Sequence, residues 1–187
     1  MNEIDPVLFR EFERTAHDRI ASSYEAFFVP ITANAAIPLL DAVHASGGTR
    51  LLDVATGPGV VAAHAARRGA SVTGIDISPR MVALAAGINP GCTFLEADVA
   101  SLPFEPSSFD AVVCAFGISH FPSATTAMRE CGRVLTPDGR LAVAWWDLPE
   151  RNRLQGVMLE GFKKSEPVRR QVFRQARRSF STRRMRR

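Results

Sequence analysis

The 187-residue chain lacks several features that define whole classes of protein. It has three cysteines, an odd number without paired spacing, which argues against a disulfide framework or a zinc site and favours a reducing compartment. No apolar run approaches the roughly 18 residues of a membrane span, and the acidic N-terminus has no apolar signal core. We therefore predict a cytoplasmic protein without a membrane span and without a metal site.

Lysine is absent before residue 163, and the basic charge of the chain gathers beyond that point. Of the 23 basic residues, 11 lie in 163–187 with a single acid, Glu166, which gives this tail a net charge of +10. Residues 1–162 hold the other 12 basic residues and 18 acids, a net charge of −6. The overall excess of +4 therefore describes the tail, and the acidic remainder argues against a nucleic-acid partner other than through the tail.

After residue 50 the chain alternates short apolar runs with helical stretches. Strands are predicted at 51–55, 71–75, 92–95, 109–115 and 141–146, and helices at 60–68, from 78 onward, and at 123–135. Five strands alternating with helices predict β-α-β units in a mostly parallel, doubly wound α/β sheet of Rossmann-like type. Pro137-Asp138-Gly139 is predicted to form a turn before the last strand. Ligands of such sheets bind at the carboxyl ends of the strands.

The N-terminal region is predicted to be helical. Residues 7–28 indicate an amphipathic helix, because apolar side chains recur every fourth residue, at Leu8, Phe12, Ala16, Ile20, Tyr24 and Phe28. A second helical stretch covers 30–44, with Pro38 predicted as a kink or restart. We therefore divide the chain into a helical cap (1–48), a core (49–162) and a basic tail (163–187), the tail disordered or irregularly helical.

Glycines and acids follow the predicted strands. Gly57 and Gly59 belong to a Gly-x-Gly-x-x-Ala loop after the first strand, and glycines let the backbone approach a ligand closely. Asp76 ends the second strand, where an acid accepts hydrogen bonds from both hydroxyls of a ribose. Asp98 ends the third strand, where it could take an adenine amino group or cap a short helix. Each acid precedes an apolar residue that either covers a flat ring or packs in the core: Ile77 and Val99.

The stretch 50–146 resembles a class I S-adenosylmethionine-dependent methyltransferase, of the small-molecule group that includes the ubiquinone- and menaquinone-biosynthesis type. The matching segments, in the family's order, are 51–59, 72–81, 97–104, 108–113 and 133–141. Ala55 stands where many members have glycine, a difference compatible with cofactor binding. The resemblance covers a little over half of the chain, and the helices before Arg50 suit the family's N-terminal cap.

The resemblance implies S-adenosylmethionine as cofactor and a role for each strand end. Asp53 and the backbone of Ala55, Thr56, Gly57 and Gly59 would hold its methionine part, Asp76 its ribose, Asp98 and Val99 its adenine, and Ala115 and Phe116 would line the floor beside the sulfonium. His120 is the candidate catalytic base for an acceptor that must lose a proton; the alternative is a structural hydrogen bond in the loop. His17 and Tyr24 could reach the acceptor if the first helix caps the pocket, or could simply pack.

Motifs that the chain lacks exclude some classes of methyl acceptor. It has no Asn-Pro-Pro-Tyr-type loop, which members acting on base amino groups carry, and no Pro-Cys nucleophile. We therefore expect in-line methyl transfer to a small, fairly apolar molecule. Two alternatives stay open: a nicotinamide-dependent oxidoreductase, which the glycine loop and Asp76 also fit, and an inactive, C-terminally truncated fragment with a basic tail. The family's last two strands are not evident, so we expect an apolar sheet edge at 141–146 and self-association through it.

Overall fold

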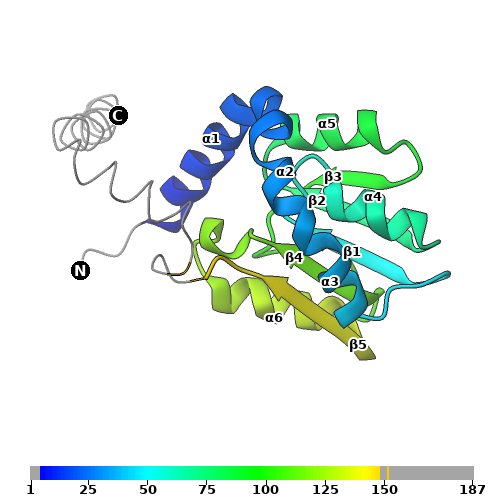
Figure 1. The fold of residues 1–187 in the computed structure, drawn as a ribbon. Helices are drawn as coiled ribbons and strands as arrows, with labels where there is room; N and C mark the ends of the chain where they lie inside the picture. The colour runs from blue at the N-terminus through cyan, green and yellow to red at the C-terminus, as the bar shows by residue number, and fades with distance from the viewer. Residues whose placement is uncertain (1–4, 148–150, 152–187) are drawn as a thin grey trace, which may run out of the picture. The chain divides into compact units, whose positions relative to one another are not determined.

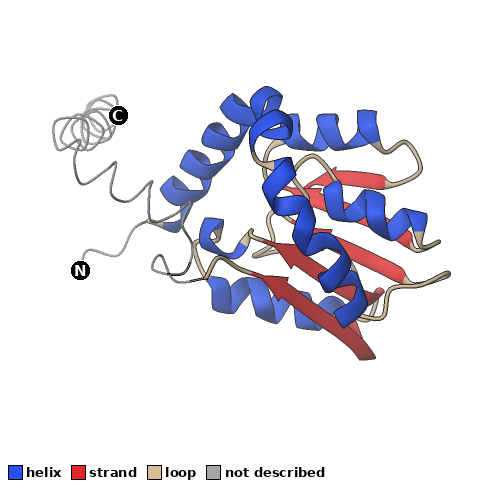
Figure 2. Cartoon of the chain, in the orientation of Figure 1, coloured by secondary structure: helices blue, strands red, loops and turns tan. Residues whose placement is uncertain are grey.

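A central sheet of parallel strands organises the structure (Figures 1 and 2). A computed structural model describes residues 5–147 and 151. Its strands are β1 (Arg50–Val54), β2 (Ser71–Asp76), β3 (Thr93–Glu96), β4 (Phe109–Ala115) and β5 (Leu135–Ala144). They lie in the order β3-β2-β1-β4-β5, and each neighbouring pair is parallel. The predicted doubly wound α/β sheet is confirmed, and its topological switch lies between β1 and β4.

Helices cover both faces of this sheet (Figure 2). The described helices are α1 (Pro6–Phe27), α2 (Val29–Thr32), η1 (Ala33–Ala35), α3 (Ala36–Ala42), α4 (Val60–Arg67), α5 (Pro79–Ile88), η2 (Ile118–His120) and α6 (Ala124–Val134). Leu51 packs in one core cluster with α3 and α4, whereas Leu52 packs in the other with α6. Neighbouring strand residues point to opposite faces, which is why β1 and β4 are apolar without alternation. No helix among the described residues has both the length and the apolar character of a membrane span.

Two helices begin where the sequence predicts them, and a serine caps each one. The Ser78 hydroxyl accepts a hydrogen bond from the Met81 N–H at 3.1 Å and caps α5. The Ser123 hydroxyl accepts from the Thr126 N–H at 3.2 Å and caps α6. Pro38 lies in the first turn of α3, after the short η1 segment, so the predicted restart of the helix falls there.

The last strand differs from the prediction. β5 begins at Leu135, and Pro137–Gly139 lie within its bounds instead of forming a turn before it. Its pairing with β4 is irregular, because Phe109 faces Leu135 whereas Ala111 faces Arg140. In the described part of the chain β5 pairs only with β4, and its Leu141 and Val143 are exposed. The predictions for the tail and the family's last strands concern segments outside the described residues.

The first helix is present as predicted, but its apolar residues do not form one buried stripe. Phe12 is 65% exposed, and Leu8 and Ile20 are exposed as well, whereas the acidic Glu13 is only 8% exposed. A spacing of four residues drifts around a helix of 3.6 residues per turn, so the stripe does not stay on one side. α1 instead turns polar side chains toward the strand ends, beside which it lies in Figure 1.

Candidate active site

Three strand ends meet at the switch point, and the loops after them build the candidate site. Asp53 lies at the end of β1 beside Val54, Asp76 ends β2 and Ala115 ends β4. Because β1 lies between β2 and β4, these loops are neighbours at the carboxyl ends of the strands. The Thr56 N–H donates to the Ile75 carbonyl at 2.9 Å, which joins the glycine loop (residues 55–59) to β2.

Asp53 is buried beneath the glycine loop. Its Oδ2 accepts hydrogen bonds from the Thr56 hydroxyl at 2.7 Å and from the Ala62 N–H at 3.1 Å. Burial raises the pKa of its carboxyl to about 7, against the opposite effect of these bonds. Asp53 therefore fastens the glycine loop and the first turn of α4 together, and its contact with the cofactor stays a prediction.

Asp76 joins the glycine loop to the turn after β2. Its Oδ2 accepts from the Gly57 N–H and its Oδ1 from the Ser78 N–H, each at 2.9 Å. Burial raises the pKa of this carboxyl, and the two backbone bonds and the nearby imidazoles of His17 and His120 act in the opposite direction. Each carboxylate oxygen keeps a second lone pair, so the group suits the predicted ribose contact.

The glycine loop uses left-handed backbone at Ala55 (φ 55°), Gly57 (φ 53°) and Gly59 (φ 82°). A Cβ on Gly57 would meet nothing within 4 Å, so the backbone there borders open space. A Cβ on Gly59 would lie 2.7 Å from Asn89 Nδ2, so this position packs closely beside the end of α5. Ala55 adopts a conformation that costs a residue with a side chain roughly 1–2 kcal/mol. Such strain is often found at ligand sites.

The loop after β4 closes against the glycine loop. A Cβ on Gly117 would lie 2.6 Å from the Ala55 Cβ and 3.0 Å from Cys114 Sγ, so only glycine lets the two loops approach this closely. Phe116 is also left-handed, with φ 63°. Ala115 is half-buried at this junction, where the resemblance places the floor beside the sulfonium.

Asp98 follows β3 and has two partners. Its Oδ1 accepts from the Ala100 N–H at 2.9 Å, and its Oδ2 forms an ion pair with Arg10 of α1. Val99 is buried in the core cluster that contains α6, and Ile77 is half-buried. The predicted adenine contacts of Asp98 and Val99 remain predictions, and a ligand bound there would share Asp98 with Arg10.

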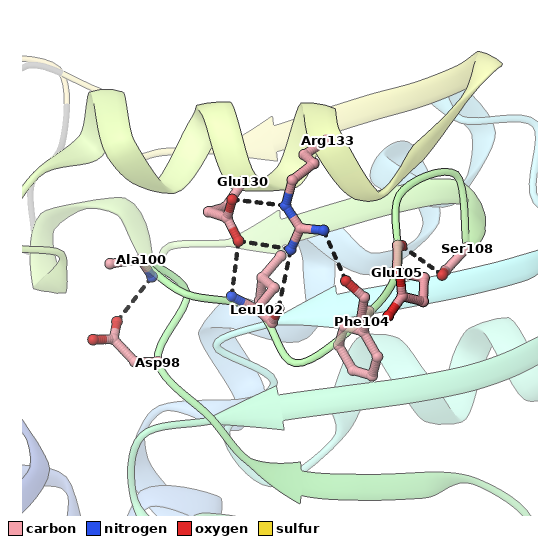
Figure 3. Close-up of polar contacts among 8 residues, drawn as sticks. All are labelled: Asp98, Ala100, Leu102, Phe104, Glu105, Ser108, Glu130 and Arg133. Carbon is pink, nitrogen blue, oxygen red and sulfur yellow. Dashed lines mark hydrogen bonds and ion pairs between the residues drawn. The ribbon is translucent and has the colours of Figure 1, made fainter.

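An ion pair on α6 holds the segment that links Asp98 to β4 (Figure 3). Glu130 Oε2 accepts from the Leu102 N–H at 2.9 Å, and Arg133 donates to the carbonyls of Leu102 at 3.0 Å and Phe104 at 2.8 Å. The hydrogen-bonded Arg133 lowers the pKa of Glu130 to about 2. The sequence analysis did not predict these contacts of Glu130 and Arg133. The sequence feature that points to them is a pair of opposite charges three residues apart on a helix.

The polar side of α1 contacts the loops after three strands. The contacts join Arg10 to Asp98, Asp18 Oδ1 to the Ser78 hydroxyl at 2.6 Å, and Glu13 Oε2 to His120 Nδ1 at 2.8 Å. Sequence reasoning missed the three α1 residues, because it assigned this helix by its apolar period and their partners lie 60 to 107 residues away. α1 is thus fastened to the loops after β2, β3 and β4.

His17 and Tyr24 of α1 also lie near these loops. The His17 Nδ1 is 2.9 Å from the Glu13 carbonyl oxygen, and its ring packs edge-to-face on that of His120, with centroids 4.8 Å apart. Burial, with a smaller effect of the Asp76 charge, raises the pKa of Tyr24. Their predicted contact with an acceptor stays a prediction.

Comparisons with known proteins identify this arrangement. A family model described as a methyltransferase domain matches residues 52–143, from β1 to β5. The crystal structure of a SAM-dependent methyltransferase from Aquifex aeolicus aligns with a TM-score of 0.58 over 77% of this chain and 74% of that one; at 18% identity it shows the fold. Residues 52–143 therefore form a methyltransferase domain.

Curated relatives of this chain are named for quinone methylation. The demethylmenaquinone methyltransferase of Beutenbergia cavernae is 40% identical over 110 residues, which are 59% of this chain and 46% of that protein. The chain spans about half the length of the curated relatives it matches. The structure of the [4+2]-cyclase SpnF is also similar, at 32% identity and TM-score 0.57, over 59% of this chain and 44% of that one. These comparisons give the nicotinamide alternative no support.

Proposed function

We propose that this chain transfers the methyl group of S-adenosylmethionine to a small-molecule acceptor. The observation that carries the proposal is Asp76, a buried carboxylate whose two oxygens brace Gly57 and Ser78 below a left-handed glycine loop. A carboxylate at the end of β2, the strand beside β1, suits the ribose of a nucleoside cofactor. The activity is a proposal because the chain spans about half of its curated relatives.

The described residues fit the cofactor. The backbone at Gly57 borders open space, and the Asp76 oxygens keep lone pairs for two ribose hydroxyls. In the proposed arrangement Asp98 and Val99 hold the adenine, Ile77 covers its ring, Ala115 lines the floor, and Asp53, Ala55, Thr56, Gly57 and Gly59 hold the methionine part. When bound, S-adenosylmethionine supplies a methyl group that its sulfonium has already activated.

The protein's own part is to orient the acceptor, exclude water and hold a proton. In-line displacement needs the reacting atoms about 3–3.5 Å apart. α1 is fastened to three loops, which supports such an enclosure. His120 is the proposed base for an acceptor that must lose a proton, because Glu13 holds its Nδ1 and leaves Nε2 for the acceptor.

The acceptor is proposed to be small and fairly apolar. The names of the curated relatives make demethylated quinols the first compounds to assay. The similarity to a cyclase shows why transfer itself has to be measured, since one fold serves different chemistries. A cytoplasmic location also stays a proposal, supported by the odd cysteine count.

Calorimetric titration with S-adenosylhomocysteine, the product of the cofactor, tests the proposal. We expect saturable binding that reduced nicotinamide adenine dinucleotide does not compete away. No binding at millimolar concentration in a sample with folded circular dichroism would refute the proposal. Binding without transfer to any quinol of the panel would favour the alternative of an inactive fragment.

A further inference from the structure

Three side chains with metal-binding chemistry meet where α1 lies against the loop after β4. Glu13 and His17 are one turn apart on α1, and His120 ends η2. One ligand atom of each residue lies within 4.8 Å of the others. Among the described residues, no other group of three histidine, cysteine or acidic side chains gathers so closely.

The spacing of this cluster is already near that of a coordination shell. Glu13 Oε2 lies 2.8 Å from Nδ1 of His120 and 3.6 Å from Nδ1 of His17. Metal–ligand bonds of about 2.1 Å at tetrahedral angles separate neighbouring ligand atoms by about 3.4 Å. The Glu13–His17 separation is already close to this value, the Glu13–His120 separation would have to lengthen slightly, and the two imidazole rings are in edge-to-face contact.

Burial also suits a metal site. The Glu13 side chain is 11% exposed, against 43% for His120, so a bound ion would have a buried ligand and an open side. His17 Nδ1 lies 2.9 Å from the Glu13 carbonyl oxygen, and coordination through this atom would replace that contact.

We propose that Glu13, His17 and His120 bind a divalent transition-metal ion such as zinc. Two imidazoles and one carboxylate favour this class of ion, whereas magnesium and calcium prefer oxygen ligands. The cysteine spacing argued against a zinc site, but this cluster contains no cysteine. The proposal goes beyond methyl transfer and does not depend on it. With the ion bound, His120 is a ligand instead of a base, and the open coordination position takes water or another oxygen ligand.

The chain offers few competing ligands. Its other histidines are His44 and His64, which lie outside the cluster. Burial raises the pKa of the Cys114 thiol to about 12 and that of Cys131 to about 11, and it also raises the pKa of Cys92. These thiols therefore stay protonated near neutral pH, and a thiol is a poor ligand compared with a thiolate.

The test is calorimetric titration of zinc chloride into the chelator-treated full chain, with cobalt(II) absorption as a second reading. We expect one ion per chain with a dissociation constant below about 10 μM. Glu13→Gln, His17→Ala and His120→Ala should each weaken binding at least tenfold. His64→Ala, the matched control, removes an imidazole outside the cluster and should leave binding unchanged.

Two results would overturn the proposal. One is the absence of saturable binding by a chain whose circular dichroism shows that it is folded, which would leave Glu13 and His120 as a hydrogen-bonded pair. The other is undiminished binding in the double variant His17→Ala/His120→Ala. Titration of the same metal-free samples with S-adenosylhomocysteine tests the methyltransferase proposal separately. A failure of the metal proposal can therefore be distinguished from a failure of the methyltransferase proposal.

Discussion

Replacing Asp76 with asparagine would test the centre of the candidate site, because the change removes the charge and nearly keeps the shape. In the native chain the two carboxylate oxygens accept from the Gly57 and Ser78 N–H groups. Asparagine has one carbonyl oxygen, so one of these N–H groups would face an NH2 donor instead. Leaving a buried donor unpaired costs about 1–3 kcal/mol. We expect urea unfolding to show a loss of stability of that size.

The same substitution should also weaken the binding of S-adenosylhomocysteine, the product of the cofactor. Asparagine loses at least one hydrogen bond from a ribose hydroxyl to a charged acceptor, worth about 1.5–3 kcal/mol. Since about 1.4 kcal/mol is tenfold in affinity, S-adenosylhomocysteine should bind about 10- to 150-fold more weakly, as read by calorimetry at a temperature where both proteins are folded.

Asp110→Asn is the matched control for this experiment. Asp110 lies near the opposite end of the sheet, where its Oδ1 pairs with Arg50 at 2.6 Å. This ion pair is exposed, so its loss should cost less than about 1 kcal/mol and leave ligand binding unchanged. If folded Asp76→Asn bound S-adenosylhomocysteine within about threefold of the native affinity, the ribose role of Asp76 would be wrong.

Three further predictions concern pH, strain and the sheet edge. Because the folded pKa of Asp53 is raised from 3.8 to about 7, the native state holds its proton more tightly than the unfolded chain. The free energy of unfolding should thus fall by up to about 4 kcal/mol between pH 4 and 8. In urea melts the free energy of unfolding of Asp53→Asn should depend less on pH than that of the native chain. Equal pH dependence in the two proteins would contradict the raised pKa of Asp53. Ala55→Gly removes the strain of a left-handed alanine but adds the conformational entropy of glycine to the unfolded chain. The net effect should be a stabilisation of about 0.5–1 kcal/mol in thermal melts. Destabilisation would show that the alanine methyl packs favourably. Val143→Lys places a charge on the exposed β5 strand and should reduce self-association in light scattering, whereas unchanged association would place the contact elsewhere.

Most of the sheet could be predicted because local rules govern its elements. Buried parallel strands are short apolar runs, and serine before a helix satisfies its first N–H groups, as at Ser78 and Ser123. The start of β5 could not be predicted in this way. Its first residues pair with β4 through a register shift, and the Pro-Asp-Gly sequence by itself favours a turn.

The sequence by itself determined which residues lie at or directly after the strand ends. It therefore determined that Asp53, Asp76, Asp98 and the glycine loop gather at the carboxyl ends of a parallel sheet. Only the tertiary structure decided what surrounds them. The contact of Glu13 with His120 spans 107 residues and that of Arg10 with Asp98 spans 88, and no local pattern encodes such pairs. The orientation of α1 depends on which side chains find partners in the loops. Its polar residues Arg10, Glu13 and Asp18 contact these loops, whereas Leu8, Phe12 and Ile20 are exposed.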